Sequence, residues 1–189
     1  MSVKKFKKLS RVLESVFKCM SLLLGVGAIG LLVGVIVSVF GSDTIKVTKS
    51  VVEMTGVAAS GVHLFTAMSG DLSEKSKFIA LVISGLVLRV AQSYICWQAG
   101  IFFSILRTSK QPFSMTVYKL LKEIGLLLII SDIVSPLIYY LVVTLLMTDG
   151  YQIALITVTS QFLIGLVIYY MAEVIRYGVT LQKFTNDVV

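Results

Sequence analysis

The sequence predicts an all-α integral membrane protein, a four-transmembrane-helix bundle with both termini cytoplasmic and a small extracytoplasmic loop. Of the 189 residues, 57% are hydrophobic and only 14% are charged, whereas soluble domains carry about 25% charged residues. Four apolar runs are each long enough to cross the ~30 Å hydrocarbon core of a bilayer, which takes about 20 residues. Unbroken runs of this length satisfy their backbone hydrogen bonds as helices.

We expect one domain over residues 1–189, with four helices, an outer loop and a cytoplasmic linker. The expected helices are 16–40, 78–103, 117–147 and 151–182, the outer loop is 41–77, and the linker is 104–116. Residues 1–15 form a basic amphipathic segment that we expect to lie at the membrane interface. A signal peptide is the alternative for this segment, but the following apolar run exceeds the ~7–15 residues of a signal, so we interpret it as an anchor.

The distribution of basic residues predicts the orientation of the bundle. The formal net charge is +7, and twelve of the 17 basic residues fall on the side of the two termini, against four on the side of the outer loop. The twelve are Lys4, Lys5, Lys7, Lys8, Arg11, Lys18, Arg107, Lys110, Lys119, Lys122, Arg176 and Lys183. Basic residues concentrate on the cytoplasmic side of membrane proteins and attract anionic lipid there. We therefore interpret the positive charge as a topology signal and expect no direct nucleic-acid binding.

The outer loop carries a weak strand signal and the single histidine. Apolar residues alternate with polar ones over 45–51, a pattern that indicates a short hairpin. His63 has no acidic or cysteine neighbour at metal-ligand spacing, so we expect a surface or packing role for it. Cys19 and Cys96 lie at different predicted depths, which argues against a disulfide. No cofactor and no metal are expected.

Two ionisable residues lie deep inside apolar runs, Arg89 in the second and Asp132 in the third. A charge in hydrocarbon is costly and normally faces the interior of a bundle with a partner, so we expect these two to pair. The predicted intramembrane polar cluster consists of Arg89, Gln92, Ser93, Asp132, Ser135 and Tyr139. Pro136 removes one backbone hydrogen bond a turn after Asp132 and predicts a kink there.

Small residues in the first helix predict close packing with another helix. Gly27, Gly30 and Gly34 fall on one helical face, and Gly30 and Gly34 form a small-x-x-x-small pattern. We expect this face to pack inside the bundle, with a dimer contact as the alternative.

Two motifs fall on the predicted cytoplasmic side. In the first, Arg107-Thr-Ser-Lys-Gln-Pro-Phe-Ser114, Pro112 blocks helix continuation, Phe113 follows at the interface and Ser114 is a candidate N-cap. The second is Met171-Ala-Glu-Val-Ile-Arg-Tyr-Gly-Val-Thr-Leu-Gln182. We expect its Glu173 to pair with Lys119, Lys122 or Arg176, and its Gly178 to permit a close approach or a helix end.

Both motifs resemble those of the bacterial four-helix membrane proteins catalogued as domain of unknown function 2975. The first resembles the family's basic-polar turn that ends in Pro-Phe-Ser, and the second resembles its Ala-Glu-hydrophobic-hydrophobic-Arg-x-Gly-Val-x-Leu terminus. This chain has Val117 where the family often has asparagine, and Lys183-Phe-Thr-Asn-Asp187 where the family has an acidic end. The resemblance implies a four-helix fold, a bacterial cytoplasmic membrane and a protein partner, a small helix-turn-helix regulator.

The sequence favours a non-enzymatic accessory or regulatory interaction module with a protein partner at the cytoplasmic face. We expect contact through residues 104–123 and Glu173–Gln182. The motifs of metal hydrolases, phosphate-binding loops and serine hydrolases are lacking, so no enzyme is predicted. The alternative is transport or binding of a small molecule or ion in a polar cavity around Arg89 and Asp132, which four helices would line only as an oligomer.

Overall fold

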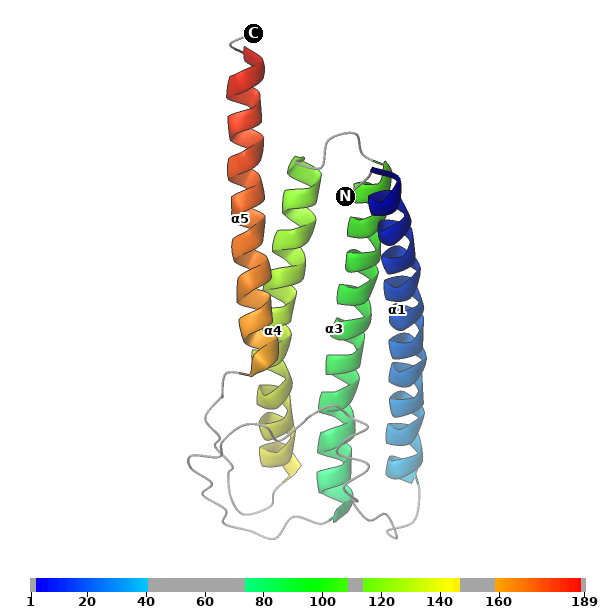
Figure 1. Cartoon of the computed structure of the whole chain (residues 1–189). Coiled ribbons are helices and arrows are strands. Elements are labelled where there is room, and N and C mark those ends of the chain that lie inside the picture. Colours follow the sequence, from blue (N-terminus) through cyan, green and yellow to red (C-terminus); the bar gives the residue numbers. More distant parts are fainter. Residues whose placement is uncertain (1–2, 41–73, 109–113, 147–158, 188–189) are drawn as a thin grey trace. The chain divides into compact units, whose positions relative to one another are not determined.

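A computed structural model describes residues 3–40, 74–108, 114–146 and 159–187. These residues form four helices and no strand: α1 (Val3–Phe40), α3 (Glu74–Thr108), α4 (Met115–Leu146) and α5 (Ser160–Asp187) (Figure 1). Each helix contains a segment long and apolar enough to cross a membrane. The prediction of an all-helical chain with four such helices is therefore confirmed. The predicted hairpin over 45–51, His63, Pro112 and Phe113 lie outside the described residues.

Helices α1 and α3 are longer than the helices that the sequence predicts at 16–40 and 78–103. Helix α1 has 38 residues and α3 has 35, against the ~20 that a bilayer requires. At ~1.5 Å per residue, α1 is about 57 Å long. Its first turns are the basic segment, whereas we expected this helix to start at residue 16. The structure has a single helix instead, because no glycine or proline breaks the chain between Val3 and Phe17.

The chain divides into two compact units; α1, α3 and α4 contribute to both, whereas α5 lies wholly in the first. One unit contains residues 1–23, 93–129 and 160–189, and the other contains residues 24–92 and 130–159. The core of the first unit consists of Ile95, Ala99 and Ile124, with side chains from all four helices packed around it. In the second unit Ala80 of α3 and Val143 of α4 are fully buried, and Tyr139 and Val142 pack against them.

The closest helix approach in the first unit joins α4 and α5 at a pair of glycines. A Cβ placed on Gly125 would lie 2.7 Å from the backbone nitrogen of Tyr169 and 2.9 Å from the carbonyl oxygen of Gly165. A Cβ on Gly165 would in turn lie 2.9 Å from the Cβ of Leu128. The two backbones are in contact because neither residue carries a side chain.

The glycine face of α1 does not make the contact that we expected. A Cβ on Gly27 or Gly30 would meet nothing within 4 Å, and one on Gly34 would reach only Val82, at an ordinary 4.0 Å. Helix α1 instead buries Glu14, Ser21 and Ala28, which lie seven residues apart. The prediction that Gly27 and Gly30 pack inside the bundle is wrong for the described residues, because the buried face follows this other line.

Candidate functional site

Helix α4 begins at a serine cap. The backbone N–H of Val117 donates a hydrogen bond to Oγ of Ser114 at 3.3 Å, and the N–H of Tyr118 donates to the Ser114 carbonyl oxygen at 3.1 Å. The first bond satisfies a backbone donor that has no partner within the helix. The predicted N-cap role of Ser114 is confirmed, and it fixes the helical position of Tyr118, one turn further on.

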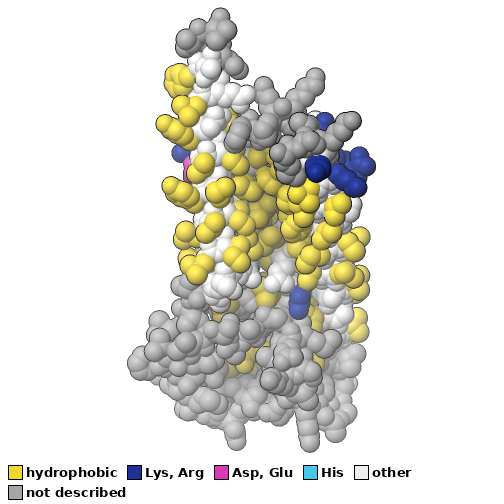
Figure 2. All heavy atoms as spheres, in the orientation of Figure 1, with side chains coloured by type: hydrophobic (Ala, Val, Ile, Leu, Met, Phe, Trp, Pro, Cys, Tyr) yellow, Lys and Arg dark blue, Asp and Glu magenta, His cyan; other side chains and the backbone are white. Residues whose placement is uncertain are grey.

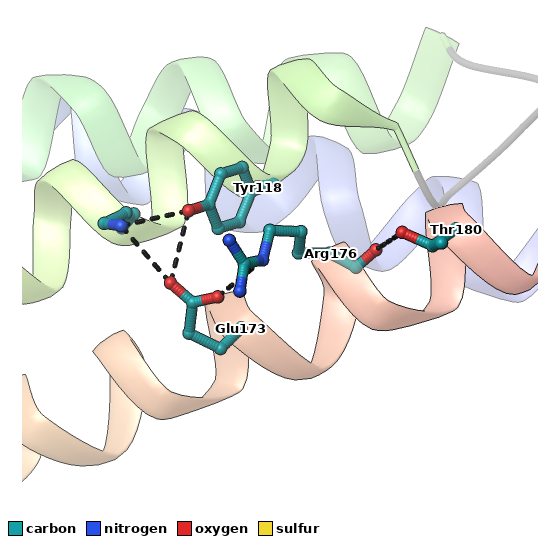
Figure 3. Close-up of polar contacts among 5 residues, drawn as sticks. Tyr118, Glu173, Arg176 and Thr180 are labelled. Carbon is teal, nitrogen blue, oxygen red and sulfur yellow. Dashed lines mark hydrogen bonds and ion pairs between the residues drawn. The ribbon is translucent and has the colours of Figure 1, made fainter.

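Glu173 of α5 is the centre of a polar contact with α4, which we name the Glu173 clamp (Figure 3). Its Oε1 lies 3.2 Å from Nζ of Lys122 and accepts a hydrogen bond from the hydroxyl of Tyr118 at 3.2 Å. Its Oε2 lies 2.8 Å from Nε of Arg176. The expected pairing of Glu173 with Lys122 and Arg176 is present, and Tyr118 is a further member.

Aromatic rings complete the Glu173 clamp. The ammonium of Lys122 lies 5.4 Å from the ring centre of Tyr118 and 5.2 Å from that of Tyr169. The guanidinium of Arg176 lies 5.9 Å from the Tyr118 ring. Cations are attracted to aromatic faces at these distances, so both cations of the clamp have aromatic as well as carboxylate partners. Gly178, two residues beyond Arg176, lies within α5 and does not end the helix.

A second ion-pair group joins α1 to α3 in the same unit. Glu14 is buried, and its two carboxylate oxygens lie 2.8 Å from Nζ of Lys18 and 3.2 Å from a guanidinium nitrogen of Arg107. A Cβ on Gly100 would lie 3.1 Å from Cγ of Lys18, so the absence of a side chain there admits the lysine stem. Phe17 and Phe103 stack beside this group, with ring centres 5.5 Å apart.

A third polar group joins α3 to α4. Glu123 accepts hydrogen bonds on Oε1 from the hydroxyl of Tyr94 at 2.9 Å and from the side-chain amide of Gln98 at 3.1 Å. The same amide donates to the Tyr94 hydroxyl at 2.8 Å. Seven charged side chains of these three groups form what we call the charged belt of the first unit: Glu14, Lys18, Arg107, Lys122, Glu123, Glu173 and Arg176.

Basic side chains outside the charged belt are exposed. Lys5, Lys7, Lys8 and Arg11 of α1 and Lys119 of α4 all face outward. Within the described part of the chain, none of these five has a carboxylate within 4.0 Å. Figure 2 shows lysine and arginine side chains gathered over the first turns of α1. This end of the first unit therefore presents an excess of positive charge to its surroundings.

In the second unit, Asp132 contacts the residue that precedes α5. The hydroxyl of Thr159 donates a hydrogen bond to Oδ1 of Asp132 at 2.6 Å, and the backbone N–H of Thr159 lies 3.4 Å from Oδ2. Ser135, one turn after Asp132, is buried, and its Oγ has no hydrogen-bond partner among the described residues.

The predicted intramembrane cluster is divided between the two units. Ser93 lies in the first unit, where its hydroxyl donates to the Ser21 carbonyl oxygen at 2.9 Å and the Ser21 hydroxyl donates to the Ser93 carbonyl oxygen at 2.8 Å. The other five members lie in the second unit: Arg89, Gln92, Asp132, Ser135 and Tyr139. Arg89 and Gln92 are half-buried, and the Tyr139 ring makes an edge contact with Tyr140 at 5.3 Å. The pair of Arg89 with Asp132 stays a prediction.

Several residues of these groups were not identified from the sequence. The four-residue spacing of Glu14 and Lys18 is a sequence signal for an ion pair on one helix. Glu123 follows Lys122 directly in an otherwise apolar stretch, which also marks it. Thr159 gives no such signal, because it lies in an apolar run and meets Asp132 only through the path of the chain.

Comparisons of this chain with protein-family models, with curated proteins and with solved structures find no match. Among the described residues, no group of three His, Cys, Asp or Glu side chains is placed to hold a metal ion.

Proposed function

We propose that this chain is a non-enzymatic module of the bacterial cytoplasmic membrane that binds a protein partner at its cytoplasmic end. In this proposal both termini are cytoplasmic, and the partner contacts residues 104–123 and Glu173–Gln182. The two motifs that resemble the four-helix family lie in these segments, and a small helix-turn-helix regulator is the partner that the resemblance implies. We propose that the chain is a relative of that family.

The observation that carries this proposal is the exposed positive charge beside the charged belt. The carboxylates Glu14 and Glu173 are occupied by cations of the same chain, so they do not neutralise Lys119 or the lysines of α1. Helix α1 continues without a break through its basic turns, whereas a lipid-binding segment of this kind lies in the membrane plane as a separate helix. A continuous basic helix whose Glu14 pairs with Arg107 of α3 is better suited to an acidic surface on a protein.

The Glu173 clamp supports the same proposal, because it fixes the surface that a partner would contact. Ser114 sets the start of α4, and Lys122 and Tyr118 then hold α5 at Glu173. A preformed surface loses less conformational entropy on binding than a mobile one. Lys119, one turn before Lys122 on α4, is exposed beside this clamp and is the residue with which we would test the contact.

The test is capture of a partner by the full-length protein, purified in mild detergent from its native host. We expect a stoichiometric protein partner with wild type, and its loss with Lys119→Glu combined with Lys7→Glu. The control is Lys119→Arg with Lys7→Arg, which keeps the charge and should keep the partner. If the charge-reversed protein retains the partner, or if wild type captures none, the proposal is wrong.

A second candidate function is binding of a small molecule or ion at Asp132. The observation in its favour is the buried Ser135 hydroxyl, which has no hydrogen-bond partner among the described residues and lies one turn from a carboxylate that accepts bonds from neutral donors. The test uses a protein in which Cys19 and Cys96 are replaced by serine and Ser135→Cys introduces a single thiol. If a water-filled cavity lies there, this thiol should react with a water-soluble thiol reagent in intact membranes. Protection of that thiol from the reagent would exclude this function.

A further inference from the structure

Helix α5 has two opposite faces, and the rest of the first unit covers one of them. Gly165, Ala172 and Val179 lie seven residues apart and are all buried, and Gly165 contacts the backbone of α4. The opposite face carries six large apolar side chains, which we name the α5 stripe: Val167, Tyr170, Val174, Tyr177, Leu181 and Phe184. Each of them is 50–68% exposed. Figure 2 shows hydrophobic side chains along the length of α5.

The spacing of the α5 stripe is that of a coiled-coil seam. Successive members are separated by three, four, three, four and three residues, without an interruption between Val167 and Phe184. In heptad terms, the a positions are Val167, Val174 and Leu181, and the aromatic residues occupy d. The same helix also exposes Leu163, Ile164, Leu166 and Met171 beside this seam. Lipid alone does not require the heptad spacing, since any apolar side chain satisfies the bilayer.

The second half of the α5 stripe extends beyond the charged belt. Glu173 and Arg176 belong to the belt, and Tyr177, Leu181 and Phe184 follow them along the helix. In Figure 1 these C-terminal turns of α5 extend past the first turn of α4. In this proposal the charged belt marks where the bundle leaves the hydrocarbon, and lipid does not cover the part of the stripe that lies beyond it. Together with Val174, these side chains expose roughly 400 Å², as much as the largest apolar patch of an ordinary soluble monomer.

We propose that the α5 stripe is a self-association surface, at which the α5 helices of two copies pack in parallel as a two-stranded coiled coil. Two copies inserted with the same orientation can bring their stripes together only in parallel, around a two-fold axis along the membrane normal. Valine at two of the three a positions favours two strands. The stripe is separate from Lys119 and the basic turns of α1, but its members Val174, Tyr177 and Leu181 fall within the Glu173–Gln182 segment of the proposed partner contact. The proposal goes beyond the binding of a separate partner because it assigns this face to a second copy of the chain.

Area and charge both fit a second copy as the occupant. The six side chains expose roughly 700 Å² per copy, close to the ~800 Å² that each partner contributes to an ordinary stable interface. The flanking e and g positions include Met171, Gly178 and Thr180, and Glu173 is already paired within its own chain. Two identical stripes therefore meet without like charges facing each other, which a self-complementary interface requires.

Disulfide cross-linking of the full-length protein in liposomes tests the proposed pairing. Cys19 and Cys96 are first replaced by serine, and single cysteines are then introduced as Val174→Cys or Leu181→Cys. The control is Val12→Cys, a position on α1 that is 52% exposed in the same unit but lies outside the stripe. On mild oxidation at high lipid-to-protein ratio, we expect the two stripe variants to become dimers and the Val12→Cys variant to remain monomeric.

The mass of the particle in detergent gives an independent measurement without introduced cysteines. We expect wild type to have the mass of two chains, Tyr177→Glu to have the mass of one, and the matched control Val12→Glu to remain a dimer. Tyr177 is 68% exposed, so its replacement leaves the fold of the monomer intact. A wild type that is monomeric, or stripe cysteines that cross-link no better than the Val12 control, would overturn the proposal. The proposal would also be overturned if, in native membranes, a different protein covered the stripe and prevented the Val174→Cys cross-link.

Discussion

Asp132 is held by a donor from the chain segment just before α5. Its Oδ1 accepts the Thr159 hydroxyl at 2.6 Å, a short bond of the charge-assisted kind. We expect Thr159→Val to lower the free energy of unfolding by about 1.5–3 kcal/mol, the usual contribution of a hydrogen bond to a charged group. Unfolding in mixed micelles measures this change. Thr180→Val is the matched control, because that exposed hydroxyl bonds only its own helix and its loss should change stability little.

Arg89 and Asp132 are the residues for which a double-mutant cycle is informative. We expect Asp132→Ala to lower the free energy of unfolding by about 3–5 kcal/mol, since it would leave a cation without its counterion in the apolar part of the bundle. Arg89→Leu should then partly restore the stability, with a coupling energy of about 0.5–3 kcal/mol. Strictly additive effects of the two substitutions would show that Arg89 and Asp132 do not interact.

At the residue scale, the sequence could identify which side chains need partners but not all of the partners. Asp132 stands out because a carboxylate in an apolar run is rare and costly. For Glu173 the sequence offered Lys119, Lys122 or Arg176 as candidate partners, and the structure pairs it with Lys122 and Arg176. Thr159 could not be assigned, since its contact depends on where α5 begins.

At the scale of helices, the contact between α4 and α5 depends on two residues without side chains. A Cβ on Gly125 would lie 2.7 Å from a backbone nitrogen, which cannot move without separating the helices. We expect Gly125→Ala to destabilise the fold by about 1–3 kcal/mol, the usual cost of overpacking a close contact. Unfolding in mixed micelles again measures the effect.

Gly30→Ala is the matched control for this prediction. A Cβ on Gly30 would meet nothing within 4 Å. Because alanine is a better helix former, this substitution should leave stability unchanged or raise it by up to about 1 kcal/mol. Equal losses from Gly125→Ala and Gly30→Ala would contradict the assignment of the close contact to α4 and α5.

The glycines also show what helix periodicity can and cannot predict. A small-x-x-x-small pattern indicates that two backbones are able to approach, and both α1 and α4 carry small residues on one face. The pattern does not indicate which helix has a suitable partner. In α1 the buried line is instead Glu14, Ser21 and Ala28, which the ion pair with Arg107 and the Ser21–Ser93 hydrogen bonds hold against α3.

The charged side chains of the Glu173 clamp lie in the two segments that we propose as the partner contact. These side chains are 27–57% exposed, and ion pairs with this much exposure contribute little to stability. We expect Glu173→Gln to leave the yield of folded protein nearly unchanged and to reduce the amount of captured partner, because Lys122 and Arg176 lose the group that positions them. Size-exclusion profiles and capture from the native host measure the two effects. Loss of folded protein would assign the clamp a purely structural role.

For the whole molecule, composition and the length of the apolar runs were sufficient to predict four membrane-spanning helices. The division of the chain into two units was not predictable, because hydropathy does not indicate which parts of each helix pack together. The three groups of the charged belt lie in one unit, around Glu14, Glu123 and Glu173. Each group joins two consecutive helices of the described chain: α1 with α3, α3 with α4, and α4 with α5.

The orientation of the whole molecule is predicted by the twelve basic residues on one side against four on the other. Because cytoplasmic loops retain positive charge, both termini should be cytoplasmic. Green fluorescent protein fused to either terminus should therefore fluoresce, and alkaline phosphatase inserted within residues 41–73 should be active. A matched variant with Lys4, Lys5, Lys7 and Lys8 replaced by glutamine removes a third of the basic residues on that side and should yield some inverted molecules. Active phosphatase at the termini of the wild-type protein would contradict the proposed orientation, and with it a partner in the cytoplasm.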